Sequence, residues 1–339
     1  MPKRKAAGSA FQGAEKFKGM HVLSTTQFQE DMLRLVFEVS SAMKEMVTTK
    51  HKSDVLRGRI LANVFFEPST RTMCSFDAAM KRLGGDVISV AESTSSAKKG
   101  ETIEDTVRCL QCYCDVLVLR HPVVGTAARA AAAASKPVLN AGDGVGEHPT
   151  QALLDLFTVV NSHKGAALPA GNGGGVDLSA LTLTLLGDLK HGRTVHSLAK
   201  LAARLERPPA MHLISPVALS MPAEICTEMT SKGVQVTTSE SLSEAMPKAD
   251  VLYVTRVQKE RFATEAEYDA VKGLYVVDAA GMKAAKKDMI VLHPLPRVDE
   301  IATDVDADPR ATYFTQMENG MYVRMALLAL VLGADLSEL

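Results

Sequence analysis

Three hydroxyl side chains and a guanidinium follow one another in Ser69-Thr70-Arg71-Thr72. An apolar-periodic run over residues 73–83 comes next and predicts a helix, so these four residues stand at its N-terminus. Backbone N–H groups of the first turn and the helix dipole favour an anion there, and an arginine adds a fixed positive charge. Ser and Thr are also ordinary helix caps, but two of them would suffice for capping. The added Arg71 favours a phosphate site.

Further polar residues stand where two other predicted strands end. Arg120-His121-Pro122 closes one run, and a Gly-rich turn leads to His148, with Gln151 one helical turn later on the same face. In open α/β sheets, ligands bind outside the carboxyl ends of strands, so we expect these side chains at a common site. Taken alone, His148 is better explained as a surface or capping residue. The glycines of the turn do not match the Gly-x-Gly-x-x-Gly dinucleotide pattern.

The elements that would position these groups alternate between short β-branched runs and amphipathic segments. This alternation predicts parallel βαβ units and therefore the α/β class, with two domains that each contain a mostly parallel sheet flanked by helices. One set of strands is predicted at residues 61–66, 86–91, 115–120 and 137–140. A second set is predicted at residues 181–186, 211–215, 235–238, 250–255, 275–278 and 289–293.

The length of 339 residues also favours two domains, because a single hydrophobic core stops growing below this size. A predicted helix at 149–160 and the Gly-rich segment 165–175 lie between the two sets of strands, so we place the division near residue 160. The apolar run 316–332 predicts a long helix that returns to the first domain. The expected domains are therefore residues 17–160, completed by 316–333, and residues 161–315.

The overall charge argues against nucleic acid and against an anionic membrane surface as partners. Lys and Arg total 38 against 39 Asp and Glu, a formal net charge of −1, which gives no global attraction to nucleic acid or to an anionic membrane. The longest apolar runs, near residues 130–134 and 325–332, fall short of the ~20 residues that a spanning helix needs. The basic start Pro2-Lys3-Arg4-Lys5 is typical of a solvated tail.

The cysteines favour a reducing, cytoplasmic location. There are five, an odd number without a disulfide-like spacing. The spacing of Cys109, Cys112 and Cys114 could suggest a metal site, but the segment has the pattern of an apolar helix and lacks a second pair of ligands. We therefore predict core cysteines and no metal.

Several ordered motifs together resemble the transcarbamoylase family, over about residues 17–333. They are Ser69-Thr70-Arg71-Thr72, Arg120-His121-Pro122, His148-Pro149-Thr150-Gln151 and Gly187-Asp188-Leu189-Lys190-His191-Gly192-Arg193-Thr194. Two more segments, 255–261 and 293–297, resemble the aspartate branch, since the ornithine branch carries a Cys in the second segment where this chain has Pro294. The start Phe17-Lys18-Gly19 further resembles the transcarbamoylase domain of eukaryotic multifunctional pyrimidine-synthesis proteins.

The resemblance implies transfer of the carbamoyl group of carbamoyl phosphate to the amine of L-aspartate, without a cofactor. The substrate amine is itself the nucleophile, so the protein must supply positioning and charge stabilisation. It implies that the carbamoyl phosphate ligands are Ser69, Thr70, Arg71, Thr72, Ser95, Lys99, Arg120, His148, Gln151, Leu295 and Pro296. Among these it implies catalytic roles for Arg71, Thr72, Lys99, Arg120 and His148, with Gln151 on the carbamoyl NH2.

For aspartate, the resemblance implies binding by Lys99, Arg193, Arg256, Gln258 and Leu295. Two carboxylates call for planar, fork-shaped cations, which suits the two arginines. Glu67 and Arg261 resemble partners in the family's inter-domain ion pairs, which form as the domains close. Ser95 and Lys99 resemble residues that a neighbouring subunit of a homotrimer lends to the active site.

Two alternatives stay open at this point. The chain could be an ornithine or other amino-acid transcarbamoylase, against which Arg256, Gln258 and Pro294 argue. It could also be an inactive carbamoyl-phosphate-binding oligomerisation domain of a larger pyrimidine protein. That alternative would require a replaced catalytic residue, and every matched position carries the family's residue.

Overall fold

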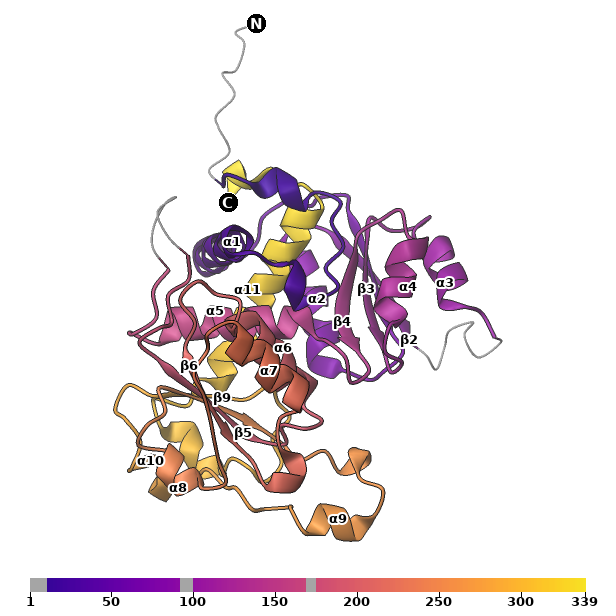
Figure 1. Ribbon diagram of the computed structural model, residues 1–339. Coiled ribbons are helices and arrows are strands. Elements are labelled where there is room, and N and C mark those ends of the chain that lie inside the picture. The colour runs from indigo at the N-terminus through magenta and orange to yellow at the C-terminus, as the bar shows by residue number, and fades with distance from the viewer. Residues whose placement is uncertain (1–10, 92–99, 169–174) are drawn as a thin grey trace, which may run out of the picture. The chain divides into compact units, whose positions relative to one another are not determined.

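The computed structural model describes residues 11–91, 100–168 and 175–339 (Figure 1). These residues form two compact units. Unit 1 contains the described residues up to Ser24, those of Asp31–Gly146, and Met321–Leu339. Unit 2 contains Thr25–Glu30 and the described residues of Glu147–Gly320.

Unit 1 is built on a four-stranded parallel sheet with the strand order β2-β1-β3-β4. The central strands are buried along nearly their whole length, as parallel strands covered by helices on both faces must be. The edge strand β2 is partly exposed. The strands are β1 (Ile60–Phe65), β2 (Asp86–Ala91), β3 (Val116–His121) and β4 (Val138–Asp143), and the helices between them are α2 (Thr70–Arg82), α3 (Ile103–Leu110) and α4 (Thr126–Ala133).

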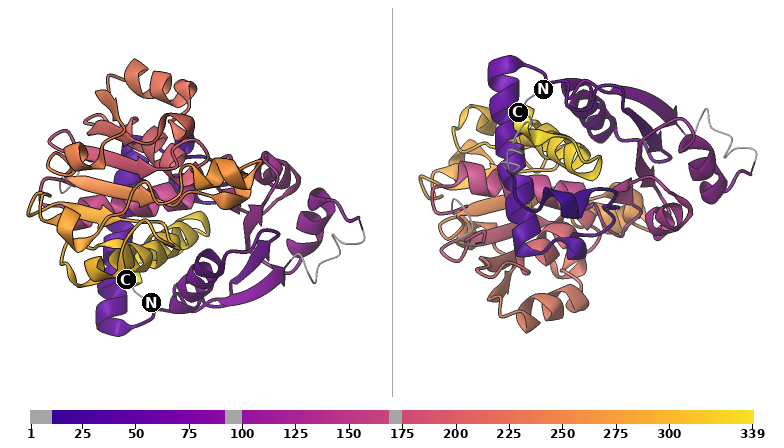
Figure 2. Two further views of the ribbon diagram at one scale, coloured as in Figure 1. Left: turned by 90° about the horizontal axis from the view of Figure 1, so that it is seen from below. Right: turned by 90° about the horizontal axis from the view of Figure 1, so that it is seen from above.

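Two long helices complete unit 1. Helix α1 (Glu30–Lys50) is not among the predicted elements, and it buries apolar side chains at helical spacing, including Leu33, Val36 and Met43. Helix α11 (Tyr313–Val331) begins in unit 2, and its residues from Met321 on belong to unit 1. It is one unbroken helix in both views of Figure 2, drawn in yellow.

The later half of α11 is anchored in unit 1 by a buried arginine. The Arg324 guanidinium donates to Ser75 Oγ at 2.8 Å and lies over the Phe76 ring, with 5.1 Å from Cζ to the ring centroid. Both partners are on α2. The contact fixes α11 against α2, because an arginine that is stacked on an aromatic ring and hydrogen-bonded has little freedom left.

Unit 2 is built on a five-stranded parallel sheet with the order β7-β6-β5-β8-β9. The chain moves outward from β5 to β7 and then returns to β8 on the other side of β5, so the order reverses between β5 and β8. The strands are β5 (Thr182–Gly187), β6 (Ala210–Ile214), β7 (Val236–Ser239), β8 (Val251–Thr255) and β9 (Ile290–Leu292), and the helices are α5 (Pro149–Ser162), α6 (Arg193–Ala202), α7 (Ala223–Ser231), α8 (Leu242–Ala245), α9 (Glu265–Asp269) and α10 (Ala279–Met282).

The predicted fold class is confirmed, with a parallel sheet and flanking helices in each unit. The predicted strand at residues 275–278 is wrong. Val277 makes only an isolated bridge to Ile301, and Asp278 instead caps α10 by accepting from Gly281 N. The segment therefore leaves its extended conformation after one bridge, because its aspartate begins a helix.

The division between the units falls at Gly146, ahead of α5, whereas the sequence placed a domain boundary near residue 160. Helix α5 contacts α6 and β9, both in unit 2. The Gly-rich segment that suggested the boundary falls partly outside the described residues.

The prediction that Cys109, Cys112 and Cys114 are core residues is wrong for the first two, which are exposed. Helix α3 ends at Leu110, so Cys112 lies in the following turn rather than on a buried helix face. Cys114 is buried, and burial raises the pKa of its thiol to about 11. Within the described part of the chain, no three His, Cys, Asp or Glu side chains group to hold a metal ion, and no helix is long and apolar enough to cross a membrane.

Candidate active site

In unit 1, the predicted phosphate residues and Arg120 come together at the carboxyl edge of the sheet. Strands β1 and β3 are neighbours, and Phe65 pairs with Arg120. The chain then passes directly from β1 through Glu67 to Ser69, which caps α2. The start of α2 and the end of β3 therefore lie at the same edge because two adjacent parallel strands end there.

The start of α2 has the local geometry of an anion site. Thr70 and Arg71 are exposed, while Thr72 is buried and accepts a hydrogen bond from Ser69 Oγ at 2.9 Å. Ser69 makes no side-chain cap to the helix amides. The N–H groups of the first turn have no acceptor within the helix, so they point towards whatever occupies the space beyond it.

Arg120 is held rigidly within unit 1. Its Nη2 donates to Glu67 Oε1 at 2.6 Å and its Nη1 donates to the carbonyl oxygen of Ala141 at 3.1 Å. The arginine is 7% exposed, so its charge is poorly screened by water. Glu67, expected from the sequence in an inter-domain ion pair, here pairs with Arg120.

In unit 2, the predicted carbamoyl residues open helix α5. His148 is the buried N-cap residue, and its backbone N–H donates to Ser197 Oγ on α6 at 3.1 Å. Gln151 follows one turn later, also buried, and its Nε2 donates to Asp155 Oδ1 at 2.8 Å. His148 is thus tied to α6, and Gln151 is tied to Asp155 on its own helix.

The two arginines predicted to bind aspartate stand at the point where the strand order of unit 2 reverses. Arg193 begins α6 after β5, and Arg256 follows β8, the neighbour of β5. Gly187 pairs with Thr255 at the ends of these strands with φ 115°, and a Cβ there would lie 2.2 Å from the Thr255 carbonyl oxygen. Only glycine permits this close approach.

Hydrogen bonds join the loops that carry the two arginines. Gln258 Nε2 donates to the carbonyl oxygen of His191 at 3.2 Å, and the backbone N–H of Gln258 lies 3.5 Å from Asp188 Oδ2. Asp188 is fully buried and also accepts from the His191 backbone N–H at 3.0 Å. The structure therefore brings Gln258 into the same cluster as the residues that precede Arg193.

The loop that carries Leu295 and Pro296 is fixed by a buried histidine. His293 Nδ1 accepts from the backbone N–H of Leu295 at 2.7 Å, so its Nε2 carries the proton that is donated to Glu300 Oε1, also at 2.7 Å. The backbone N–H of His293 donates to Gln316 Oε1 at 2.8 Å. Leu295 has φ 53° and its peptide bond to Pro296 is cis.

The pair of His293 and Glu300 leads to a prediction about acid stability. Burial by itself would raise the pKa of Glu300, but the hydrogen bonds from His293 and from backbone N–H groups outweigh burial and lower the pKa from the ordinary 4.5. A carboxyl with a lower pKa in the folded state contributes stability above its unfolded pKa, and this is lost as the pH falls through the folded value.

We therefore expect the melting temperature of the protein to fall more steeply below about pH 4.5 than that of Glu300→Gln. One hydrogen bond of about 1 kcal/mol corresponds to about 1–2 °C at this chain length. Thermal melts of both proteins across the acid range measure the difference. Parallel profiles would contradict the assigned role of Glu300.

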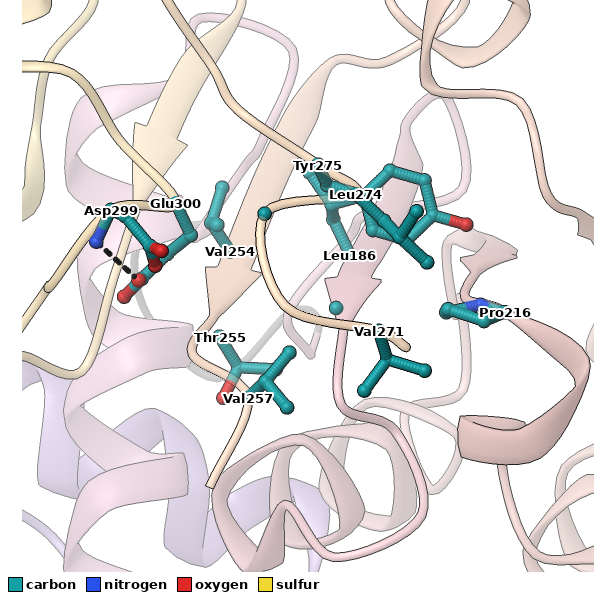
Figure 3. A pocket seen from close by; sticks show the side chains of 12 residues that line it. Leu186, Pro216, Val254, Thr255, Val257, Val271, Leu274, Tyr275, Asp299 and Glu300 are labelled. Atoms are coloured by element: carbon teal, nitrogen blue, oxygen red, sulfur yellow. Dashed lines mark hydrogen bonds between the residues drawn. The ribbon is translucent and has the colours of Figure 1, made fainter. Parts of the chain in front are cut away.

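A small pocket lies in unit 2 beside β5 and β8 (Figure 3). Thr255 and Val257, the neighbours of Arg256, line it, and Asp299 donates its backbone N–H to Glu300 Oε2 at 3.1 Å on one side. The remaining lining is Leu186, Gly187, Pro216, Val254, Val271, Gly273, Leu274 and Tyr275. The predicted aspartate ligands are not part of this lining.

Three predicted residues stay outside these clusters or outside the described structure. Arg261 is exposed in a short 3-10 helix, Lys259–Arg261. Ser95 and Lys99 lie outside the described residues. Sequence reasoning in turn missed Asp155 and Glu300, which hold predicted site segments in place. Asp155 could have been noticed as a charge within the otherwise apolar run 152–160.

Cations and hydroxyl groups at the carboxyl edges of both sheets define a two-unit α/β protein suited to anionic ligands. Comparison with known protein families gives a match to each half of the chain. The carbamoyl-P binding domain of aspartate/ornithine carbamoyltransferase matches residues 20–161, and the Asp/Orn binding domain matches residues 179–331. The chain belongs to the aspartate/ornithine carbamoyltransferase family.

Similar proteins include both single enzymes and parts of larger ones. The chain is 48% identical to the aspartate carbamoyltransferase catalytic subunit of Thermococcus kodakarensis, covering 94% of this chain and 98% of that protein. It is 49% identical to the multifunctional protein pyr1-3 of Dictyostelium discoideum over 93% of this chain, but spans only 14% of that protein's length. The multifunctional protein CAD of Squalus acanthias is 50% identical over 94% of this chain and 14% of its own length.

Solved structures agree with the fold. A crystal structure of aspartate transcarbamoylase from Trypanosoma cruzi in complex with aspartate and phosphate matches with a TM-score of 0.83 and 44% identity, covering 95% of this chain and 98% of that chain. The complex of that enzyme with carbamoyl phosphate and aspartate gives a TM-score of 0.85 at 43% identity, covering 95% and 99% of the two chains.

Proposed function

We propose that this chain is an aspartate carbamoyltransferase, which converts carbamoyl phosphate and L-aspartate to N-carbamoyl-L-aspartate and phosphate, an early step of de novo pyrimidine biosynthesis. The observation that carries the proposal is the joined edge of β5 and β8, where Arg193, Arg256 and Gln258 gather. Two guanidinium forks suit a substrate with two carboxylates. The similarity to aspartate carbamoyltransferase catalytic subunits over nearly their full length supports the same activity.

We place carbamoyl phosphate at the start of α2, at the end of β3 and at the residues that open α5. The first domain, residues 17–160 with 316–333, supplies most of them, and residues 161–315 form the aspartate domain. Ser69, Thr70, Arg71 and Thr72 hold the phosphate group at a helix N-terminus. Thr72, Arg120 and His148 surround the carbamoyl oxygen, and Gln151 accepts from the carbamoyl NH2.

The chemistry is a direct acyl transfer. The aspartate amine attacks the carbamoyl carbon, a tetrahedral intermediate forms, and the bond from that carbon to the phosphate oxygen then breaks. The amine loses one proton, and phosphate leaves with the bonding electron pair and takes up that proton, so that atoms and charge balance. Charge builds first on the carbamoyl oxygen and then on the phosphate, so donors fixed in advance at both positions lower the barrier.

Backbone carbonyl oxygens near Leu295 and Pro296 orient the attacking amine by accepting its hydrogen bonds. The hydrogen bonds of this loop support this role, because His293 holds the Leu295 amide and Glu300 holds His293. A loop fixed in this way loses little entropy on binding. Arg261 and Glu67 contribute to closure around the substrates, which excludes water.

A direct assay tests the activity. The purified protein is incubated with carbamoyl phosphate and either L-aspartate or L-ornithine, and carbamoylated product is measured. We expect carbamoyl aspartate and no citrulline. Product only with ornithine would establish the other branch of the family, and no product with either would establish an inactive carbamoyl-phosphate-binding domain.

We further propose a cytoplasmic homotrimer in which Ser95 and Lys99 of one subunit complete the site of its neighbour, with Lys99 also meeting aspartate. Exposed apolar side chains on unit 1 support a subunit interface: Tyr113, Val123, Val124 and Val145 are each about half exposed or more. The free thiols of the described chain support a reducing compartment. The multifunctional relatives support fusion to other pyrimidine-pathway domains.

Subunit mixing tests the shared site. Lys99→Ala and Arg71→Ala chains, each inactive alone, are combined in equal amounts under conditions that exchange subunits. About three trimers in four are then hybrids, and each hybrid has one site of three where an intact Arg71 meets an intact Lys99. We expect activity to return to about a quarter of wild type.

Native mass spectrometry provides the control by showing that hybrid trimers have formed. A mixture that stays inactive although hybrids are present would mean that each site is built from one chain.

A further inference from the structure

Asp155 is a fully buried carboxylate in the middle of α5, and three hydrogen-bond donors converge on it. Gln151 Nε2 and Gln316 Nε2 donate to Oδ1, at 2.8 and 2.6 Å, and the Tyr253 hydroxyl donates to Oδ2 at 2.9 Å. The partners come from α5, α11 and β8, and all belong to unit 2. A buried charge is costly unless it is hydrogen-bonded in this way.

The direction of these hydrogen bonds is fixed by a backbone amide. His293 N–H can only donate, and it donates to Gln316 Oε1 at 2.8 Å. The other end of the Gln316 amide, its NH2 group, must therefore face Asp155. The Gln151 amide presents its Nε2 to the same carboxylate oxygen at 2.8 Å, so its NH2 group also faces Asp155.

The Tyr253 hydroxyl is likewise a hydrogen-bond donor, to the second carboxylate oxygen of Asp155. Burial, then the charge of Asp155, raise the pKa of the tyrosine well above 10, so the hydroxyl keeps its proton and donates it. Thr194, next to Arg193, also hydrogen-bonds the Tyr253 hydroxyl. Every contact described around Asp155 thus treats it as an acceptor.

We propose that Asp155 is a positioning residue that fixes the Gln151 side-chain amide with its NH2 group inward and its carbonyl oxygen Oε1 towards the ligand. This rests on the proposed function, in which Gln151 meets the carbamoyl NH2 of carbamoyl phosphate. Oε1 then accepts from that NH2. In a flipped amide, the NH2 group of Gln151 would face the carbamoyl NH2, and two donors cannot hydrogen-bond to each other. Asp155 thereby makes the site select a carbamoyl group over an acyl group of the same size.

The preference for a carbamoyl group can be measured with two stable ligands that differ only in the group that faces Gln151. Phosphonoacetamide carries a phosphonate, a carbonyl and an NH2 group, and acetonylphosphonate has CH3 in place of that NH2. We expect wild type to bind phosphonoacetamide about tenfold more tightly, as titration calorimetry would measure, because a site built to accept a hydrogen bond rejects the analogue that lacks it.

Asp155→Leu has similar size and removes the acceptor, so we expect the tenfold preference to fall to about twofold or less while acetonylphosphonate binding stays within about twofold. Asp155→Asn keeps one oxygen that can accept from both glutamines, and we expect it to retain most of the preference. Tyr253→Phe is the matched control. It removes the contact to Oδ2 and leaves Oδ1 and its two donors in place, so the preference should be unchanged.

Equal weakening of both ligands in Asp155→Leu, with the preference kept, would show a merely structural role and overturn the inference. The proposed function would then stand if the wild type still makes carbamoyl aspartate; a wild type without that activity would overturn both. Should Asp155→Leu fail to fold, neutron diffraction of deuterated wild type decides the question. Two deuterons on the Gln151 atom nearest Asp155 support the inference, and none there would overturn it.

Discussion

Arg71→Ala is expected to lower kcat by about 100- to 1,000-fold while the protein stays folded. Removing one fixed donor from a developing negative charge has an effect of this size in other acyl-transfer sites, about 3 kcal/mol or more. Arg71 stands on the exposed first turn of α2, where the helix amides already attract a phosphate. Its charge should therefore matter most as the phosphate departs, which places the loss in kcat.

The measurement is steady-state kinetics with both substrates, together with thermal melts. Lys81→Ala is the matched control, since Lys81 is an exposed cation near the other end of α2 and pairs with Asp77 at 3.1 Å. We expect both variants to melt within about 2 °C of wild type, as exposed substitutions do. Turnover near the wild-type value in Arg71→Ala would remove the phosphate-site assignment.

Arg256→Ala is expected to raise the KM for aspartate by about 100-fold and to lower kcat, with little change in the binding of carbamoyl phosphate. A charged hydrogen bond lost from a carboxylate in a desolvated site costs about 2–5 kcal/mol. Arg256 follows β8, whereas the phosphate residues follow β1 in the other unit. The two variants should therefore separate the two substrates.

Arg256→Lys sharpens the test, because lysine keeps the charge and loses the planar fork. We expect it to recover only part of the aspartate affinity. Lys259→Ala is the control, since Lys259 is exposed three residues further on and pairs with Glu265. Unchanged aspartate affinity and turnover in Arg256→Ala would contradict the assignment of aspartate specificity.

The regular elements could be predicted where local pattern and tertiary environment agree. Strand β2 has the predicted bounds because a short apolar-rich run follows two glycines, Gly84 and Gly85. The prediction failed at residues 275–278, where an apolar run met a helix cap at Asp278. It also failed at Cys109 and Cys112, because an apolar-looking segment does not reveal which of its sides is covered.

The sequence by itself determined the α/β class and the ordered motifs that give the family. Alternating periodicity and the residues at strand ends are local features, which can be recognised in the sequence without knowing any tertiary contact. It could not determine what fixes those residues. Asp155 meets partners 98 and 161 positions away, and the order of strands that joins the loops after β5 and β8 is set by packing. Such contacts exist only once distant segments share one core, so only the tertiary structure decided how the site residues are held.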